Sequence, residues 1–468
     1  MLQLATRLHI RSCFAAFSFY GRRYITIPTS IPSKGLINLT ESSRFLEITG
    51  KDASTFINGL TTVKMLPKHL KKNQTTISEA DINNSKIVES INLSEELITT
   101  SNWGILHENE EFSPTDPEEL PMRLGVRRDG RYGLILKANG RVFTDIFIYP
   151  TPFLPITLES STTPSYIIEV MNKEQFKPLL MTLKLHKLRS QVDIKELNAN
   201  AWFYYDDTDR GIEVYDSLLD QYFANANSKS PESAASLVTL FFQNEVLFDK
   251  KVDKSNVLGL AIDQRSDYFG VRILYKTSEI PPIKDIDEKT TMLPYETYIT
   301  RRVKNGIVET SDFQSTASLP FECNLDWMHG INYEKGCYMG QELTIRTWTG
   351  NGTVRRVLPI KFDTPVPVID DAFERFELKA IESDKKKEEG EAAVYNPFGQ
   401  SISDTAPKPV RSRRDMSKVG ELLVTNGVEG LAKVEKRYFD WDTEEIKKVK
   451  VVVRDQVYIA TIDTSLWN

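Results

Sequence analysis

The chain has 468 residues, more than the roughly 250–300 at which a single hydrophobic core stops growing, so two or three domains are expected. With 40% hydrophobic and 26% charged residues the composition is that of a globular protein, and a net charge of -6 gives no basic field for nucleic acid. No apolar stretch approaches the ~20 residues that cross a bilayer, which predicts no membrane insertion. Three cysteines cannot build a disulfide framework and favour a reducing compartment.

The amino terminus differs in composition from the rest of the chain. Residues 1–40 contain no Asp or Glu, whereas arginines are spread among apolar residues and serines at Arg7, Arg11, Arg22 and Arg23. This pattern is typical of a mitochondrial targeting segment, and the same arginines would interrupt the apolar core of a secretory signal. We assign residues 1–26 to a targeting segment and expect the protein in the mitochondrial matrix.

Short strands at 37–39 and 44–48 are predicted next, followed by a helix through Phe56–Leu60 that Asp52 or Ser54 caps. Residues 78–120 then hold on the order of ten acidic residues against a single lysine, which predicts an inserted, largely solvated loop. A docking surface for a basic partner is the alternative for this acidic insert.

Strands resume at 132–136 and 142–148, on either side of Asn139–Gly140, a strong hairpin signal. A further strand is predicted at 166–170, and apolar residues at helical spacing predict an amphipathic helix over 172–188. Alternating strands and helices of this kind indicate an α/β or α+β body.

From about residue 355 the pattern changes to strands and turns, which predicts a small antiparallel barrel or sandwich. Its predicted strands are 357–360, 420–424, 430–434 and 449–453. Between the first two lies a polar, charged stretch without periodicity, about 380–415, which predicts a disordered loop.

Several kinds of site are not indicated. The five histidines are isolated from one another, so a zinc site is not expected. The glycine patterns of dinucleotide-binding and P-loop proteins are missing, as is the G-x-S-x-G turn of hydrolases.

Cys337 is the main candidate for chemistry, because it lies between Lys335 and two glycines rather than among apolar residues. A neighbouring cation or a helix N-terminus lowers the pKa of a thiol, and Lys335 and a helix opening at Gly340 could supply both. The alternative is a small packing thiol. Cys323 has apolar neighbours and is predicted to be structural. Two mature cysteines cannot supply the four thiolates of an iron–sulfur cluster, so any cluster would be shared with a partner.

Asp145 follows the hairpin on an apolar strand. A carboxylate in that position could hold an amine-bearing ligand or act as a general base. By strand alternation alone, it could equally face water.

The segment Leu319–Ile360 contains L-P-F-E-C-N-L-D and then K-G-C-Y-M-G-Q-E, and it closely resembles the YgfZ group of folate-binding proteins, relatives of the glycine-cleavage T-protein (aminomethyltransferase). Further matches extend through most of the mature chain. They are Phe56–Thr62, Gly140–Asp145, Asp263–Arg265, Gly270–Leu274 and Gly430–Ala432.

The resemblance implies an α+β fold, a three-domain ring of the aminomethyltransferase type with a C-terminal antiparallel β-barrel. Residues 31–350 would form the interleaved folate-binding-type body and 355–468 the barrel, with the inserts 78–120 and 380–415 outside the match. A tetrahydrofolate-type pocket is expected near the centre, with Cys337 close to its mouth.

Within this group, a mitochondrial address implies a matrix factor that helps to form [4Fe–4S] clusters on aconitase-like and lipoyl- or biotin-synthase-like recipients, in cooperation with A-type scaffold proteins. Such a factor is non-enzymatic or only cryptically enzymatic. The alternative is a tetrahydrofolate-dependent aminomethyltransferase with Asp145 as base. Against it, aminomethyltransferases lack the cysteine signature and carry paired aspartates where this chain has Thr144–Asp145.

The candidate site residues follow from both lines of reasoning. Cys337 and Lys335 are the candidates for thiol chemistry, and Cys337 is the candidate ligand of a transient, shared iron–sulfur cluster. The candidates for contacts to tetrahydrofolate are Asp145, Tyr338, Gln341, Glu342 and Arg346.

Overall fold

The computed structural model describes most of the chain after the predicted targeting segment. The described residues are 31–67, 93–108, 124–154, 163–225, 227–284, 286, 292–314, 317–333, 335–350, 352–369, 376–381, 418–439 and 448–465. The predicted targeting segment 1–26 and almost all of the predicted loop 380–415 therefore lie outside the described residues. In the described part of the chain, no helix is long and apolar enough to cross a bilayer.

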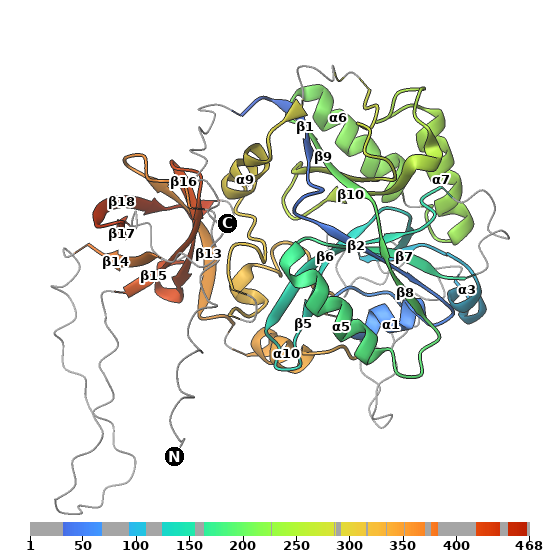
Figure 1. Ribbon diagram of the computed structural model, residues 1–468, viewed down its shortest axis with the longest axis horizontal. Coiled ribbons are helices and arrows are strands. Elements are labelled where there is room, and N and C mark those ends of the chain that lie inside the picture. The colour runs from blue at the N-terminus through green and yellow to red at the C-terminus, as the bar shows by residue number, and fades with distance from the viewer. Residues whose placement is uncertain are drawn as a thin grey trace, which may run out of the picture.

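One five-stranded sheet lies at the centre of the body in Figure 1, and all of its strand pairs are antiparallel. Its strand order is β5 (Arg131–Leu136), β6 (Val142–Pro150), β7 (Ser165–Val170), β2 (Arg44–Thr49) and β8 (Asp193–Leu197). Helices α1 (Ala53–Leu60) and α5 (Phe176–His186) cover its outer face and share one apolar core with it. A short 3-10 turn, Lys173–Gln175, precedes α5.

A second five-stranded sheet lies against the first. Its order is β10 (Val257–Asp263), β11 (Gly270–Tyr275), β9 (Asn200–Asp206), β1 (Lys34–Asn38) and β12 (Met292–Leu293), and only the β1–β12 pair is parallel. Helix α6 (Asp209–Ser217), a π-helical turn (Leu218–Phe223) and α7 (Pro231–Gln243) cover its outer face. Aromatic side chains such as Phe153, Phe241 and Phe248 dominate that core.

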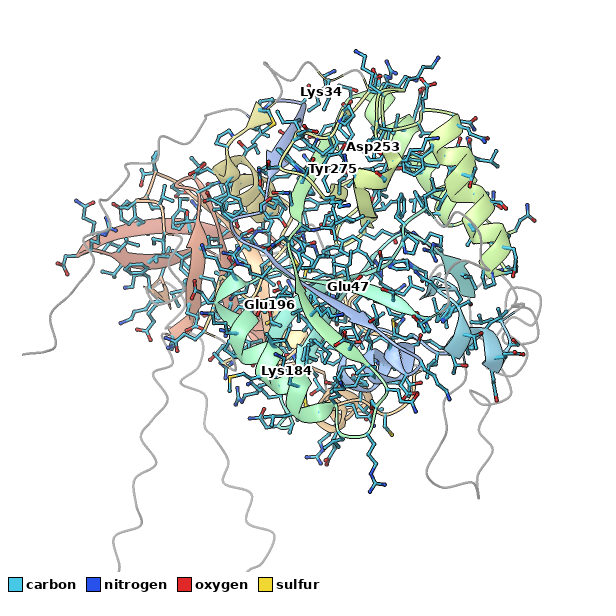
Figure 2. The ribbon with its side chains drawn as sticks, turned by 45° about the vertical axis from the view of Figure 1, so that its right-hand side comes forward. Lys34, Glu47, Lys184, Glu196, Asp253 and Tyr275 are labelled. Atoms are coloured by element: carbon cyan, nitrogen blue, oxygen red, sulfur yellow. The ribbon has the colours of Figure 1, made fainter. Side chains whose placement is uncertain are left out.

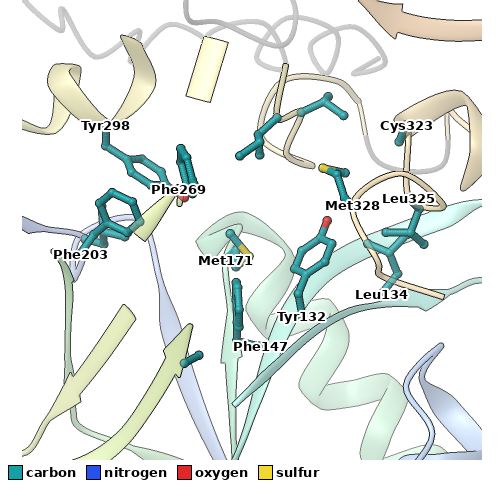
Figure 3. Packing of buried hydrophobic residues seen from close by; sticks show 14 of the residues in the cluster. Tyr132, Leu134, Phe147, Met171, Phe203, Phe269, Tyr298, Cys323, Leu325 and Met328 are labelled. Carbon is teal, nitrogen blue, oxygen red and sulfur yellow. The ribbon is translucent and has the colours of Figure 1, made fainter. Parts of the chain in front are cut away.

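The inner faces of the two sheets share the largest core. Figure 3 shows Phe203, Phe269 and Tyr298 gathered on one side, with Tyr132 and Met328 facing them across Met171. Strand β9 contributes Phe203 to this core. Helix α9 (Tyr295–Lys304) contributes Tyr298 and touches both β1 and the C-terminal barrel.

The C-terminal strands form a closed barrel, drawn at the left of Figure 1. Its circular order is β13 (Arg355–Phe362), β16 (Glu429–Glu435), β15 (Lys418–Thr425), β14 (Phe376–Ala380), β17 (Lys448–Val453) and β18 (Gln456–Ile462). Every adjacent pair is antiparallel. The structure therefore confirms an α+β protein with a C-terminal antiparallel barrel. The strand pattern alone allowed either a barrel or a sandwich, and the structure shows a barrel.

Two local predictions are wrong in part. Asp52 occupies the N-cap of α1, but its carboxylate accepts a hydrogen bond from Gln191 N (2.7 Å) instead of capping the helix, and Ser54 bonds Tyr166 within the core. The acidic insert is not all solvated loop. Residues 93–108 form α3 (Glu95–Thr100) and β3 (Ile105–Glu108), which pairs with β4 (Leu124–Arg127), because Trp103 and its apolar neighbours bury a small core of their own. The rest of the insert, residues 78–92 and 109–120, lies outside the described residues.

Candidate functional site

The signature segment is held against the end of α1 by a buried lysine. Lys335 Nζ donates to the carbonyl oxygens of Asn58 (2.7 Å), Thr61 (2.5 Å) and Val63 (2.8 Å), which are left without helical partners where α1 ends. Burial, and then the charge of Lys64, lowers the pKa of Lys335, whereas three carbonyl acceptors favour its ammonium form. The ammonium also lies 4.6 Å from the centre of the Tyr338 ring.

A second set of buried hydrogen bonds joins the same two segments to the central sheet. Thr62 Oγ1 donates to Gly330 O (2.6 Å) and accepts from Leu134 N of β5 (2.8 Å). Asn332 N donates to Thr62 O (3.1 Å), and its side-chain oxygen accepts from Lys64 N (2.8 Å). The motif Phe56–Thr62 and the signature segment within Leu319–Ile360 are therefore parts of one structural unit.

The hairpin motif belongs to this unit as well, through two glycines with left-handed backbones. Gly340 has a φ of 80°, and a Cβ placed on it would lie 2.4 Å from Lys137 O. Gly140, at the hairpin turn, has a φ of 76°, and a Cβ there would lie 2.7 Å from the Leu343 Cβ. Only glycine fits both positions, which explains why the signature and the hairpin each carry one.

Cys337 is exposed on this loop, whereas the residues on either side hold it in place. Tyr338 N donates to Gln341 Oε1 (3.0 Å), and Met339 N donates to Gly59 O (3.0 Å). Helix α10 (Gln341–Thr349) begins four residues after the thiol. The loop therefore presents a free thiol on a backbone that is fixed on both sides.

The other predicted residues of the signature lie in different environments. Tyr338 is buried, which raises its pKa to about 12. Glu342 and Arg346 form an exposed ion pair one turn apart on α10 (2.8 Å), of the kind that contributes little to stability. Cys323 is buried in the main core, as predicted for a structural cysteine, and burial raises its pKa to about 12 (Figure 3).

Asp145 lies inside the protein rather than on the solvent side of its strand. Thr310 donates to its carboxylate twice, from the backbone N–H (3.1 Å) and from Oγ1. Burial, and then the negative charge of Glu309, raises the pKa of Asp145 to about 6 despite these two hydrogen bonds. Lys335, in contrast, contacts the loop at the end of α1, so the structure does not gather the predicted residues around one point.

A buried network of charges lies next to Asp145, and sequence reasoning identified only part of it. Arg265 binds the Asp263 carboxylate with two nitrogens (2.8 and 2.7 Å) and Glu309 with a third (2.8 Å). The Tyr298 hydroxyl donates to Glu309 (2.5 Å) and accepts from Arg265 (2.9 Å). Burial alone would raise the pKa of Glu309, but Arg302 and Arg265 lower it to about 2.

The same tyrosine connects this network to a second ion pair. Arg272 donates to Tyr298 (3.1 Å) and binds Glu169 of β7 (2.5 Å). The motifs 263–265 and 270–274 thus place their arginines between the two sheets. Four members of this network were not predicted from the sequence: Glu169, Tyr298, Arg302 and Glu309. Glu169 could have been predicted, because a glutamate within the otherwise apolar run 166–170 indicates a buried charge.

A cleft of about 480 Å³ opens beside this network. Tyr132 and Met328 line its inner part, and it also carries charges of both signs, among them Arg127, Arg131 and Asp267. Asp145 does not line the cleft. It lies close enough to Tyr132 for its charge to raise the pKa of that phenol further, after the larger effect of burial.

No group of three or more His, Cys, Asp or Glu side chains within the described ranges could hold a metal ion. The fold and this loop define the class: an α+β protein with a C-terminal barrel, in whose described part Cys337 is an exposed thiol on a fixed loop.

Relatives with known names match most of the chain. The "Iron-sulfur cluster assembly factor IBA57 homolog, mitochondrial" of Debaryomyces hansenii is 38% identical over 351 residues, 71% of each chain. The protein of the same name in Meyerozyma guilliermondii is 33% identical over 413 residues, 86% of each chain. The Saccharomyces cerevisiae "Iron-sulfur cluster assembly factor IBA57, mitochondrial" is 25% identical and spans 86% of this chain and 83% of its own length.

The chain belongs to this family of mitochondrial iron–sulfur cluster assembly factors. No family model matches it. Among solved structures, the glycine cleavage system aminomethyltransferase T from Bartonella henselae superposes with a TM-score of 0.47 at 9% identity, covering 92% of this chain and 85% of that one.

Proposed function

We propose that the protein matures [4Fe–4S] clusters on recipient enzymes of the mitochondrial matrix, aconitase-like and lipoyl- or biotin-synthase-like, together with A-type scaffold proteins. The observation that carries this proposal is the exposed Cys337 on a loop whose neighbours are fixed by buried contacts. A fixed, accessible thiolate can occupy one coordination position of a cluster without a large entropic cost. The partner supplies the remaining thiolates.

The surface next to Cys337 supports docking of a protein partner. Helix α10 exposes Ile345 and Trp348, and the Trp348 ring stacks on Tyr333 with 4.5 Å between ring centroids. Half-exposed tryptophan and tyrosine are the residues most often found at the energetic centres of interfaces. A partner on this face would bring its own cysteines within reach of Cys337.

Anaerobic reconstitution with an A-type partner tests the cluster role. Parent, Cys337→Ala and Cys337→Ser proteins are mixed with the partner and an iron and sulfide source, and cluster absorbance is followed, with Val452→Ala on the exposed surface of the barrel as control. We expect both cysteine variants to lose the shared cluster and the control to keep it. Full recovery of [4Fe–4S] enzyme activities by Cys337→Ala in a depleted strain would refute the thiol role.

Tetrahydrofolate remains a second proposed ligand, because the cleft is of the size of small-molecule sites and pairs the Tyr132 ring with arginines that could hold a glutamate tail. Asp145, the proposed pterin contact, does not line the cleft, so it would contact a ligand there only after a rearrangement of the side chains around it. Such a site would also permit the alternative function, tetrahydrofolate-dependent aminomethyl transfer, with Asp145 as base.

Calorimetric titration with tetrahydrofolate tests the ligand. Binding that weakens in Asp145→Asn and in Arg131→Ala would support a folate site. Undetectable binding to the parent protein, together with no turnover of an aminomethyl donor, would remove both the ligand and the transferase alternative.

A further inference from the structure

The outer face of α5 carries an unusual set of apolar side chains. Among the described residues, the three most exposed large hydrophobic side chains are Met181 (67%), Leu185 (73%) and Leu188 (87%). All three come from α5 or the two residues after it, a different element from the loop before α10 that carries the thiol. Single exposed leucines are ordinary, but three in one place mark a contact surface.

Helical geometry explains how α5 is apolar on two sides. Phe176, Leu179 and Leu183 point into the core beneath the helix. Met181 and Leu185 are one turn apart on the opposite side, since a helix has 3.6 residues per turn. Leu188 follows the C-cap with a φ of 43°, a left-handed backbone that usually takes glycine, and its side chain is exposed.

Basic residues surround this apolar strip. Between residues 173 and 190 there are five, Lys173, Lys177, Lys184, Lys187 and Arg189, against one acidic residue, Glu174, for a local charge of +4. The whole chain carries -6. Lys184 is labelled on the outer helix in Figure 2, and the acidic Asp193 on the neighbouring strand β8 is paired with Lys195 (2.6 Å). The helix and its flanking residues are therefore basic, although the exposed Glu196 lies on the neighbouring strand β8 and the chain as a whole is acidic.

We infer that α5 binds peripherally to an anionic lipid surface. Met181, Leu185 and Leu188 enter the boundary between headgroups and acyl chains, and the lysines around them contact the lipid phosphates. Their flexible stems allow the ammonium groups to stay at headgroup level while the strip is buried. With eleven residues, α5 lies in the plane of the surface and does not cross it.

The composition of this face favours lipid over a protein partner. Lysine is depleted in protein–protein interfaces and leucine is rare among their energetic centres, whereas interfacial helices combine leucine with lysine. Helix α10 differs from α5, because it exposes Trp348 and Ile345, and tryptophan is common at the energetic centres of protein interfaces. The two helices would then serve different partners, and the lipid contact does not depend on the proposed cluster chemistry.

Vesicle flotation tests the inference. The mature chain is mixed with phosphatidylcholine vesicles that contain about a quarter of phosphatidylglycerol, or with pure phosphatidylcholine vesicles, and the fraction that floats is measured. We expect binding to the anionic vesicles only, with loss at high salt. Because each lysine near an anionic surface contributes about 1 kcal/mol, the double variant Lys177→Ala/Lys184→Ala should bind roughly 25-fold more weakly.

A second variant tests the apolar strip. Met181→Gln/Leu185→Gln/Leu188→Gln should bind at least roughly tenfold more weakly, since it removes the side chains that enter the bilayer. The matched control is Val452→Gln/Val457→Gln, two exposed valines of the barrel, which should float like the parent. Circular dichroism of each variant shows that the fold is kept.

Three outcomes would overturn the inference. They are absence of flotation, equal flotation with neutral vesicles, and unchanged flotation of the glutamine variant. Two further experiments test whether α5 binds something other than lipid. If only a chain lacking residues 109–120 floats, that acidic part of the insert covers α5 instead. If immobilised poly-glutamate retains the parent while vesicles do not, the face binds an acidic protein.

Discussion

Replacing Lys335 by methionine separates the structural part of the signature from its thiol. The side chain of methionine fills most of the lysine stem but donates no hydrogen bond, so the carbonyl oxygens of Asn58, Thr61 and Val63 lose their donor within the protein. Each hydrogen bond to a charged group contributes about 1.5–3 kcal/mol. Part of this loss of stability is offset, because folding of the variant no longer has to transfer a charged ammonium from water into the protein interior.

We therefore expect Lys335→Met to lower the free energy of unfolding by about 3 kcal/mol. Urea unfolding followed by tryptophan fluorescence measures this as a lower midpoint at unchanged slope. Cys337→Ala is the matched comparison, because its exposed side chain should change the stability by no more than about 0.5 kcal/mol. Equal midpoints for the parent and Lys335→Met would show that the carbonyl contacts do not hold the loop.

Three further predictions concern the contacts around the site. Gly340→Ala should lower the unfolding free energy by about 2 kcal/mol, because it forces an alanine with a left-handed backbone against Lys137 O. Thermal unfolding measures this loss. Gly352→Ala is the control for the backbone cost alone, since Gly352 also has a left-handed backbone (φ 73°) but faces solvent. Tyr298→Phe should cost about 2 kcal/mol in the same assay, because its hydroxyl serves Arg265, Arg272 and Glu309 at once, and a loss below about 0.5 kcal/mol would contradict that role. For Asp145, folding raises the pKa from 3.8 to about 6, so between these values the folded protein holds a proton that the unfolded chain has released. Stability should therefore fall by up to about 3 kcal/mol as the pH rises from about 4 to above 6, and Asp145→Asn should remove that part of the decline in urea unfolding at a series of pH values.

The local elements followed from the sequence because their signals are local. Asn139–Gly140 between two apolar runs predicted the hairpin of β5 and β6, and the spacing of Phe176, Leu179 and Leu183 predicted α5. Apolar periodicity records which face of an element is buried, and no distant contact is needed to see it. In the acidic insert the excess of acidic residues predicted a solvated loop. Residues 93–108 are folded instead, because Trp103 and its apolar neighbours form a small buried core.

The signature Lys335–Glu342 likewise identified the family and singled out Cys337 from the order of its residues alone. That order does not reveal the use made of Lys335. Its closeness to Cys337 suggested a cation for the thiol, whereas the described hydrogen bonds of its ammonium go to carbonyls of a segment more than 270 residues away in the chain. Whether it also affects the thiol stays a prediction.

Tertiary structure alone decided which charges are buried and what they bind. Asp145 was ambiguous on its strand because alternation gives two faces and the sequence does not say what covers each. Packing of the second sheet and α9 over the inner face buried it beside Glu309 and Thr310, and raised its pKa. Local patterns thus determined the elements and the exposed thiol, whereas the electrostatics of the interior depended on contacts between residues far apart in the chain, which only the folded packing brings together.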